Sequence, residues 1–426
     1  MTRAHSPFAV HKIRTVSHLL KEMHRQSGRR WRQALQILDR EGFAGITRRV
    51  RNATSRRLAC GGEREFVLPE DVLRADLSAT FVPSQPGLAK GEAIRVNWVM
   101  TPPSEGSGGH STMFRIINHL ERNGYKNQVY LYDVYGVDHR YYVETIRSYY
   151  RFLGPVLPME EGMEDAHAVM ATAWPTAYAA FNARSAGKRF YFVQDIEPAF
   201  HPTGSFSLMA ENTYRMGFYG ITAGKWLAEE LRARYGMEAD HFDFGCDCTN
   251  YVHTPGPRPP AVAFYARRET ARRGFELGVL ALEVLTRKRK DVEIHLYGET
   301  TSKLPFAFVN HGRLCPKELN LLYGKCRAGL SLSLTNVSLV PHEMLSAGCI
   351  PVVNDADRNR MVLANPRVVY AEPTPHHLAT ALNAVLSAAD CETTSKLASL
   401  SVRTTSWEES GAKVDQSLRS ALRPVQ

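Results

Sequence analysis

Residues 330–355 read LSLSLTNVSLVPHEMLSAGCIPVVND. The stretch opens with apolar and β-prone residues, which predict a buried strand of a parallel sheet. A loop, Pro341 and a short helix that carries Glu343 follow, and Gly348 stands where a helix commonly ends. Residues 350–353 predict the next strand. We therefore expect a β-loop-α-β unit with one carboxylate, Glu343, in the first turn of its helix.

This unit has the features of a binding site for a phosphate-bearing ligand. The N-terminus of a helix offers free backbone N–H groups and the positive end of the helix dipole. A carboxylate beside it can accept hydrogen bonds from sugar hydroxyls. From the pattern alone, an ordinary β-α-β crossover with a solvated or capping Glu343 is the simpler interpretation.

The spacing of these residues resembles a known signature. The pattern P-x-E-x-x-x-x-G-x-x-P-V-V, from Pro341 through Glu343 and Gly348 to residues 351–353, resembles the donor-binding signature of GT-B glycosyltransferases of the family 4 type. The resemblance implies that Glu343 binds the ribose of a nucleotide-sugar and that the turn at Pro341 faces its diphosphate. Many members carry an earlier Glu eight positions upstream, where this chain has Thr335. We keep Thr335 among the donor-binding candidates, and in this departure the sequence resembles the WsaF-type bacterial rhamnosyltransferases.

Composition limits the class of protein. A chain of 426 residues is long for one core and predicts two domains with additions. No apolar run approaches the roughly 20 residues that span a bilayer, and we expect no secretory signal. Seven scattered cysteines argue against a disulfide framework. Cys246 and Cys248 lack the further ligands of a metal site. We expect reduced thiols, no metal and a cytoplasmic protein.

The net charge of +10 lies in one segment of the chain. Residues 1–65 hold 15 Lys and Arg against 5 Asp and Glu, whereas the remaining 361 residues hold 38 of each. Apolar residues at helical spacing predict a basic amphipathic helix over residues 1–60, which suits an anionic membrane surface. A helical arm packed on the protein itself is an equal alternative. Nucleic acid is disfavoured because no recognisable nucleic-acid module accompanies the arm.

Residues 93–254 read as a first Rossmann-like domain, reached through a connector at residues 66–92. A strand over 94–100, a glycine-rich loop and a helix over 112–123 form its opening. The loop contains Gly108, Gly109 and His110. A glycine pair lets the backbone approach a ligand closely. The resemblance implies that this loop lies over the donor phosphates and the acceptor, with His110 among the catalytic candidates; a flexible loop with a chance His is the alternative.

Two carboxylates follow the strand that we expect over residues 189–193. Asp195 and Glu197 stand in Q-D-x-E-P, just past a carboxyl strand end, where ligands bind in open α/β sheets. They can position an acceptor hydroxyl or act as a base. With F-x-P-T-G at residues 200–204, the segment resembles the WsaF-type enzymes. The alternative is that Asp195 caps a turn and Glu197 is solvated.

A proline-rich linker at residues 255–260 begins the second Rossmann-like domain, residues 255–404. Arg267 and Arg273 flank the loop after its first strand. Arginine presents a planar fork of donors that suits a diphosphate. The loop resembles the G-R-x-x-x-K-G of the family, although Arg272 is an alternative to Arg273 and an exposed basic loop is the simpler interpretation.

Two further segments of this domain also match the family pattern. His311 lies in a turn that the resemblance puts near the nucleobase, with a satisfied loop histidine as the alternative. A helix near residues 405–422 resembles the terminal helix that crosses back onto the first domain.

The resulting expectation is an α/β protein of the GT-B type: two Rossmann-like domains facing a cleft, with a basic helical N-terminal extension. By resemblance it transfers a hexose, with L-rhamnose from dTDP-rhamnose as the suggested donor, to a hydroxyl of a cell-surface glycan or lipid-linked acceptor. Arg267, Arg273 and the helix N-terminus near Glu343 would neutralise the diphosphate without a metal or other cofactor. A non-catalytic sugar-nucleotide-binding module and a sugar-nucleotide 2-epimerase of the same fold are the alternatives, and the Q-D-x-E-P segment counts against the epimerase. The sequence does not predict an oligomeric state.

Overall fold

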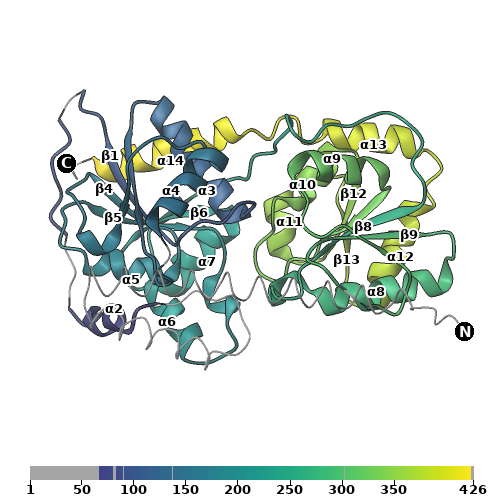
Figure 1. The fold of residues 1–426 in the computed structure, drawn as a ribbon, viewed down its shortest axis with the longest axis horizontal. Coiled ribbons are helices and arrows are strands. Elements are labelled where there is room, and N and C mark those ends of the chain that lie inside the picture. The colour runs from purple at the N-terminus through teal and green to yellow at the C-terminus, as the bar shows by residue number, and fades with distance from the viewer. Residues whose placement is uncertain (1–66, 80–82, 90, 137, 302, 424–426) are drawn as a thin grey trace, which may run out of the picture. The chain divides into compact units, whose positions relative to one another are not determined.

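A computed structural model describes residues 67–423 except 80–82, 90, 137 and 302 (Figure 1). The basic helical extension predicted for residues 1–65 therefore lies outside the described residues. Two parallel sheets organise the rest. The first has the order β3-β2-β1-β4-β5-β6-β7. Its strands are β1 Arg95–Met100, β2 Lys126–Leu131, β3 Val156–Pro158, β4 Ala168–Ala171, β5 Lys188–Val193, β6 Tyr219–Ala223 and β7 Ala239–Phe242.

The second sheet repeats this plan with the order β10-β9-β8-β11-β12-β13. Its strands are β8 Ala261–Ala266, β9 Glu293–Gly298, β10 Val309–Asn310, β11 Ala328–Leu330, β12 Ile350–Asn354 and β13 Val369–Ala371. In each sheet the first strand pairs with the second on one side and the fourth on the other, so the strand order reverses beside it. This is the Rossmann arrangement, and the prediction of two Rossmann-like sheets is confirmed.

Helices cover the faces of both sheets, and the strands are short apolar runs buried between them. The first half of the molecule has α2 Pro69–Arg74, α3 Gly108–Arg122, α4 His139–Tyr149, α5 Trp174–Asn182, η2 Glu197–Phe200, α6 Ser205–Thr213 and α7 Lys225–Tyr235. The second half has η3 Ala271–Arg273, α8 Phe275–Lys288, α9 Pro316–Lys325, α10 Val340–Ser346, α11 Asp357–Leu363, α12 Pro375–Leu386 and α13 Cys391–Leu400. A turn of 3-10 helix, η1 Met159–Glu161, follows β3.

The last helix, α14 Trp407–Leu422, returns to the first half as the resemblance predicts. It packs on α3 and β7, and its Val414 and Leu418 are fully buried. Glu408 accepts a hydrogen bond from His119 Nδ1 over 2.7 Å. The Ala421 carbonyl accepts one from Lys188 Nζ over 2.8 Å. Residues from near the C-terminus therefore complete the core around the first sheet.

Part of the predicted connector is a packed element of the first half. The α2 helix lies in residues 66–92, and its Asp71 is buried. The Asp71 carboxylate accepts a hydrogen bond from Tyr132 Oη over 2.7 Å. The Asp71 carbonyl accepts another from Asn182 Nδ2 over 2.8 Å.

The strand expected at the start of residues 330–355 is shorter than predicted. β11 ends at Leu330, and residues 331–339 form a loop before α10, called the 331–339 loop below. Beyond Ser331 the backbone leaves the sheet, because Ser333 N donates to Asn354 Oδ1 and Leu334 N to the Arg272 carbonyl. Polar side chains and neighbouring turns replace the strand ladder there.

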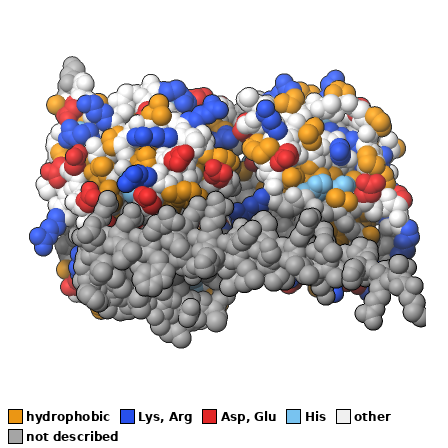
Figure 2. All heavy atoms as spheres, viewed as in Figure 1, with side chains coloured by type: hydrophobic (Ala, Val, Ile, Leu, Met, Phe, Trp, Pro, Cys, Tyr) orange, Lys and Arg blue, Asp and Glu red, His pale blue; other side chains and the backbone are white. Residues whose placement is uncertain are grey.

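No helix among the described residues is long and apolar enough to cross a membrane. On the face drawn in Figure 2, acidic and basic side chains of the described residues are interspersed.

Candidate functional site

Arg267, Arg273, Thr335, Pro341 and Glu343, which are five of the predicted donor residues, lie in segments that follow β8 and β11 of the second sheet. Arg267 follows β8, and the 331–339 loop follows β11, its neighbour in the sheet. The strand order reverses between these two strands, and ligands of open α/β sheets bind at such points. The loop leads directly into α10, which has Pro341 in its first turn and Glu343 two residues later.

Glu343 lies in a network drawn from both halves of the molecule. The Tyr251 hydroxyl donates a hydrogen bond to the Glu343 carboxylate. Arg115 of α3 and Asp247 lie nearby, joined by an ion pair of 2.7 Å between Arg115 Nη2 and Asp247 Oδ2. Burial raises the pKa of Glu343 to about 7, and the positive charge of Arg115 opposes that rise. Glu343 is therefore a partly buried carboxyl that titrates near neutral pH.

Arg267 is held at the strand end by a carboxylate and an aromatic ring. Its Nε donates to Glu299 Oε1 over 2.9 Å, and its Nη1 donates to Tyr265 Oη over 3.3 Å. About a third of its side chain, 35%, is exposed. Burial lowers the pKa of Arg267, but Tyr265 and Glu299 outweigh it and leave the pKa raised. The guanidinium is thus oriented and charged, with surface left for an anion.

Arg273 and Arg272 extend in different directions from η3. Arg273 Nη1 donates to Ser333 Oγ over 2.7 Å and to the Asn336 carbonyl over 3.1 Å. Arg272 places its guanidinium 4.0 Å from the centre of the Phe200 ring. Arg273 therefore contacts the 331–339 loop, whereas Arg272 contacts the first half of the molecule.

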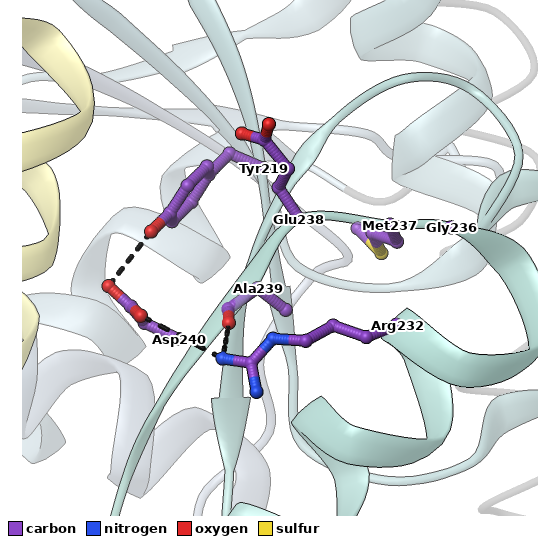
Figure 3. Close-up of a pocket in the computed structure, with 7 residues that line it drawn as sticks. All are labelled: Tyr219, Arg232, Gly236, Met237, Glu238, Ala239 and Asp240. Carbon is purple, nitrogen blue, oxygen red and sulfur yellow. Dashed lines mark hydrogen bonds and ion pairs between the residues drawn. The ribbon is translucent and has the colours of Figure 1, made fainter.

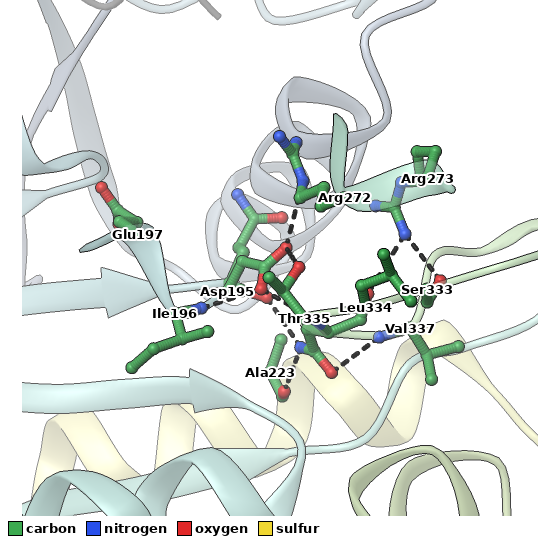
Figure 4. Close-up of polar contacts among 12 residues, drawn as sticks. Asp195, Ile196, Glu197, Ala223, Arg272, Arg273, Ser333, Leu334, Thr335 and Val337 are labelled. Atoms are coloured by element: carbon green, nitrogen blue, oxygen red, sulfur yellow. Dashed lines mark hydrogen bonds and ion pairs between the residues drawn. The ribbon is translucent and has the colours of Figure 1, made fainter. Parts of the chain in front are cut away.

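The structure brings Asp195 and Thr335 into direct contact (Figure 4). Thr335 Oγ1 donates to Asp195 Oδ2 over 3.0 Å, and both residues are buried. Arg272 Nε lies 3.4 Å from the same carboxylate oxygen. The predicted acceptor-side carboxylate is thus bonded to the loop that carries Thr335, one of the predicted donor residues.

The side chain of Glu197 bonds to residues of the first half. Its Oε2 accepts from the backbone N–H of Trp174, the first residue of α5, and its Oε1 accepts from Tyr191 Oη over 2.9 Å. Only 4% of Glu197 is exposed. Glu197 is therefore a buried carboxylate that accepts a hydrogen bond from an otherwise unpaired backbone N–H group at the start of α5.

The glycine pair lies in a helix rather than a loop, which corrects our expectation. Gly108 and Gly109 form the start of α3, and Ser107 caps it by accepting from His110 N. A Cβ atom on Gly109 would stand 3.5 Å from the Gln194 side chain, an ordinary contact, and one on Gly108 would meet nothing within 4 Å. The protein's own packing therefore does not require glycine at either position.

His110 is fixed through both ring nitrogens. Its Nε2 lies 3.0 Å from the Thr101 carbonyl, so Nε2 donates, and Nδ1 then accepts from Ser107 Oγ over 2.8 Å. Burial lowers the pKa of His110 to about 4. The ring is therefore neutral at neutral pH and already hydrogen-bonded.

His311 lies apart from these residues, beside β9. Its Nε2 lies 3.0 Å from His295 Nδ1. Burial and the charge of Lys325 lower its pKa. The structure thus gathers Asp195, Thr335 and Arg273 in one cluster, whereas the side chains of Glu197 and His311 bond to other residues.

Sequence reasoning missed the partners of Glu343. Arg115, Asp247 and Tyr251 come from α3 and from the segment after β7, far from α10 in the sequence. Asn336 was also missed, although it stands next to Thr335 in a loop already singled out. Its only signal in the sequence is its position in the loop between the strand and the helix that carries Glu343.

No group of three or more His, Cys, Asp or Glu among the described residues could hold a metal ion. A surface hollow of about 370 Å³ lies at the edge of the first sheet (Figure 3). It is lined by Tyr219, Arg232, Gly236, Met237, Glu238, Ala239 and Asp240, and contains none of the predicted site residues.

Solved structures of low sequence identity define the class of the fold. A glycosyltransferase from Rickettsia africae ESF-5 aligns with a TM-score of 0.58 at 13% identity, over 78% of this chain and all of that one. Anabaena Alr3699/HepE in complex with UDP-glucose aligns with a TM-score of 0.57 at 15% identity, over 77% of this chain and 99% of that one. The fold is the GT-B fold of glycosyltransferases.

Two sequence matches add to the likeness in fold. Residues 260–383 match the family model of the WsaF C-terminal domain. The chain is 37% identical over 263 residues to the O-antigen biosynthesis protein RfbC of Myxococcus xanthus, a match over 59% of this chain and 20% of that protein. The chain thus spans about a fifth of the length of this relative. Together, the matches show a GT-B fold whose residues 260–383 are similar to the WsaF C-terminal domain and part of whose sequence is similar to an O-antigen biosynthesis protein.

Proposed function

We propose that this protein transfers a hexose from a nucleoside diphosphate sugar to a hydroxyl group of a growing surface polysaccharide. The relative from Myxococcus xanthus is named for O-antigen biosynthesis, and the Anabaena structure holds UDP-glucose. The first supports a saccharide acceptor, and the second supports a nucleotide-sugar donor. L-rhamnose from dTDP-rhamnose is the donor that the WsaF-like signature favours.

The observation that carries the proposal is the position of Arg267, Arg273 and Glu343. All three lie at the carboxyl ends of the second sheet and within the segment that matches the WsaF C-terminal domain. In the proposed complex, Glu343 accepts hydrogen bonds from the ribose hydroxyls. Arg267 and Arg273 neutralise the diphosphate as it leaves, which stabilises the charge that develops in the transition state.

We also propose a site of action at the cytoplasmic face of the membrane. The support is the charge of residues 1–65, which carry an excess of ten positive charges. A lipid-linked saccharide acceptor would be presented at such a surface. Residues 1–60 would then bring the enzyme to its acceptor by electrostatic attraction to anionic lipids.

A nucleotide panel followed by a turnover assay tests the proposal. Thermal shifts with UDP, dTDP, GDP and their sugars should identify one nucleoside diphosphate that raises the melting temperature more than its nucleoside. Incubation with the matching nucleotide-sugar and a saccharide acceptor should release that diphosphate. Binding without turnover would support the non-catalytic module, and an epimerised nucleotide-sugar would support the epimerase. No stabilisation by any member of the panel would contradict the proposal.

A further inference from the structure

Polar contacts join the carboxyl ends of β5 and β6 to the 331–339 loop (Figure 4). The carboxylate of Asp195, two residues past β5, accepts three hydrogen bonds and forms one ion pair. Its Oδ1 accepts from Asn336 N and from Ile196 N, each over 2.8 Å. Its Oδ2 accepts from Thr335 Oγ1 and faces Arg272 Nε. Three of these four groups belong to the second half of the molecule.

Asn336 makes the reciprocal contact from the loop. Its Nδ2 donates to the carbonyls of Gln194, over 2.7 Å, and Ala223, over 2.9 Å. Its Oδ1 accepts from Trp226 Nε1 over 3.0 Å and from Val337 N over 2.9 Å. Both donors and both acceptor positions of the amide are therefore used, and Asn336 is only 1% exposed.

The same loop is held from the other side by residues of the second half. Arg273, a proposed diphosphate ligand, donates to Ser333 and to the Asn336 carbonyl. Asn354 accepts from Ser333 N over 2.8 Å and donates to the Ser333 carbonyl over 3.0 Å. The 331–339 loop thus bonds both to Arg273, which is proposed to bind the diphosphate, and to the first half of the molecule.

We propose that Asp195 and Asn336 are positioning residues that hold the 331–339 loop in the conformation that binds the nucleotide. The inference rests on the proposed function and extends it. Contact between the two halves and nucleotide binding then strengthen each other, because both require the same loop conformation. In this role Asp195 keeps its hydrogen bonds and removes no proton from the acceptor.

Nucleotide-free hydrogen exchange tests the contact itself. In Asn336→Ala, amide exchange should rise both in the 331–339 loop and in residues 194–200 of the first half, because the bonds to the Gln194 and Ala223 carbonyls are lost. Asn354→Ala is the matched control: it frees the loop within the second half and should raise exchange only there. Equal patterns in the two variants would overturn the positioning role.

Nucleotide binding tests the coupling. We expect dTDP or UDP, whichever binds more tightly, to slow exchange at residues 194–200 in the unmodified protein. The Kd should rise on the order of tenfold in Asn336→Ala, a typical size for coupling between sites. If nucleotide protects the 331–339 loop but not residues 194–200, the proposed function stands and this inference fails. Tighter nucleotide binding in the variant would also overturn it.

Thr335 offers a variant that preserves shape. Thr335→Val removes the hydroxyl that donates to Asp195 and keeps the side-chain volume, whereas Thr335→Ser keeps the hydroxyl. Under the proposal, the KM for the donor rises more than kcat falls in the Val variant, and the Ser variant restores most of the loss. Asp195→Asn should likewise raise donor KM. A fall in kcat alone, with donor affinity and exchange unchanged, would assign Asp195 to the acceptor reaction instead.

Discussion

Burial and charge act in opposite directions on Glu343. Loss of water around the carboxyl favours its neutral form, while Arg115 and the Tyr251 hydroxyl favour the charged form. The outcome is a pKa of about 7. A change of pH or a single substitution can therefore switch the group between its two forms.

Glu343→Gln should weaken binding of the preferred nucleoside diphosphate. Charge-assisted hydrogen bonds to the ribose would be lost, at about 1.5–3 kcal/mol or roughly a 10- to 150-fold rise in Kd. Titration calorimetry measures this. The melting temperature should not fall, since an amide in a buried position costs less than a carboxylate. Unchanged affinity in the folded variant would refute the ribose role.

Donor affinity should also fall as the medium becomes acidic. Because the raised pKa is about 7, Glu343 loses its charge below neutral pH, and Kd should rise by up to about tenfold per pH unit there.

The protonation of Glu343 affects the stability of the folded protein in the opposite direction to its effect on affinity. Between its ordinary 4.5 and about 7 the folded protein binds more protons than the unfolded chain, so this group's contribution falls as pH rises. Both slopes should be absent in Glu343→Gln, measured by calorimetry and denaturation between about pH 5 and 8.

Arg267→Ala should reduce affinity for diphosphates far more than for nucleosides. Arg267 is oriented by Glu299 at the end of β8, where the diphosphate is proposed to lie. Arg268→Ala is the control. Arg268 is the next residue, and its side chain is exposed and packs over Phe275, so this variant removes the same charge from a neighbouring position. Equal losses for nucleoside and diphosphate, or equal effects of the two variants, would exclude Arg267 as a phosphate ligand.

Among single residues of the candidate site, the sequence predicted those that stand in short motifs and missed those that are defined by contacts between distant parts of the chain. Glu343 and Pro341 stand in a short motif, and Arg267 follows a recognisable strand. Arg115 and Tyr251 meet Glu343 only because the chain folds. No periodicity links residues that lie so far apart, so these partners are visible only in the structure.

Among the secondary-structure elements, the glycine pair shows where local propensity gave the wrong answer. Glycine costs about 1 kcal/mol in a helix relative to alanine, which is why Gly108 and Gly109 predict a loop. The Ser107 cap and the burial of Phe114 and Ile117 in the first core stabilise α3 enough to include both glycines. Tertiary packing here outweighs the propensity of the first turn.

The end of α10 depends on Gly348. Its φ of +81° is strained for other residues, and a Cβ atom would stand 2.5 Å from His253 Cδ2 and 2.8 Å from Arg258 Nη2. Gly348→Ala should lower the free energy of unfolding by at least about 1–3 kcal/mol. Denaturant titration measures the loss.

Gly324→Ala is the matched control in α9. No atom lies within 4 Å of the added methyl group and the backbone is helical, so this change should stabilise the protein by about 0.4–1 kcal/mol. If Gly348→Ala proves as stable as Gly324→Ala, the close approach at the end of α10 is not required.

For the whole molecule, the sequence predicted the two sheets better than the contact between them. Buried apolar runs separated by helical patterns indicate two α/β halves, and the strand orders agree with that prediction. The bonds among Asp195, Thr335 and Asn336 were not predictable, because polar residues of this kind equally suit solvated loops. Only the structure shows that they satisfy one another across two sheets.

The separation of charge along the chain predicts a salt-sensitive interaction with membranes. Residues 66–426 carry 38 charges of each sign, so attraction to anionic lipid must come from residues 1–65. Each Lys or Arg near the surface contributes about 1 kcal/mol, screened over about 8 Å at physiological salt. The chain of 426 residues should sediment with anionic liposomes at low salt and be released at high salt.

Removal of residues 1–60 should abolish sedimentation with liposomes and spare nucleotide binding. Neutral liposomes control for nonspecific trapping. If the chain of 426 residues does not bind anionic liposomes, or if the truncated chain is insoluble, an arm packed on the protein itself is favoured.

The position of α14 affects how the molecule can be made. The partner of His119 is Glu408, which emerges from the ribosome 289 residues later, or about 15–60 s at roughly 5–20 residues per second. Until then the side chains of α3 and β7 that pack against α14 stay uncovered. The half that is synthesised first is thus completed last, and during translation its apolar surface is open to chaperones and to aggregation.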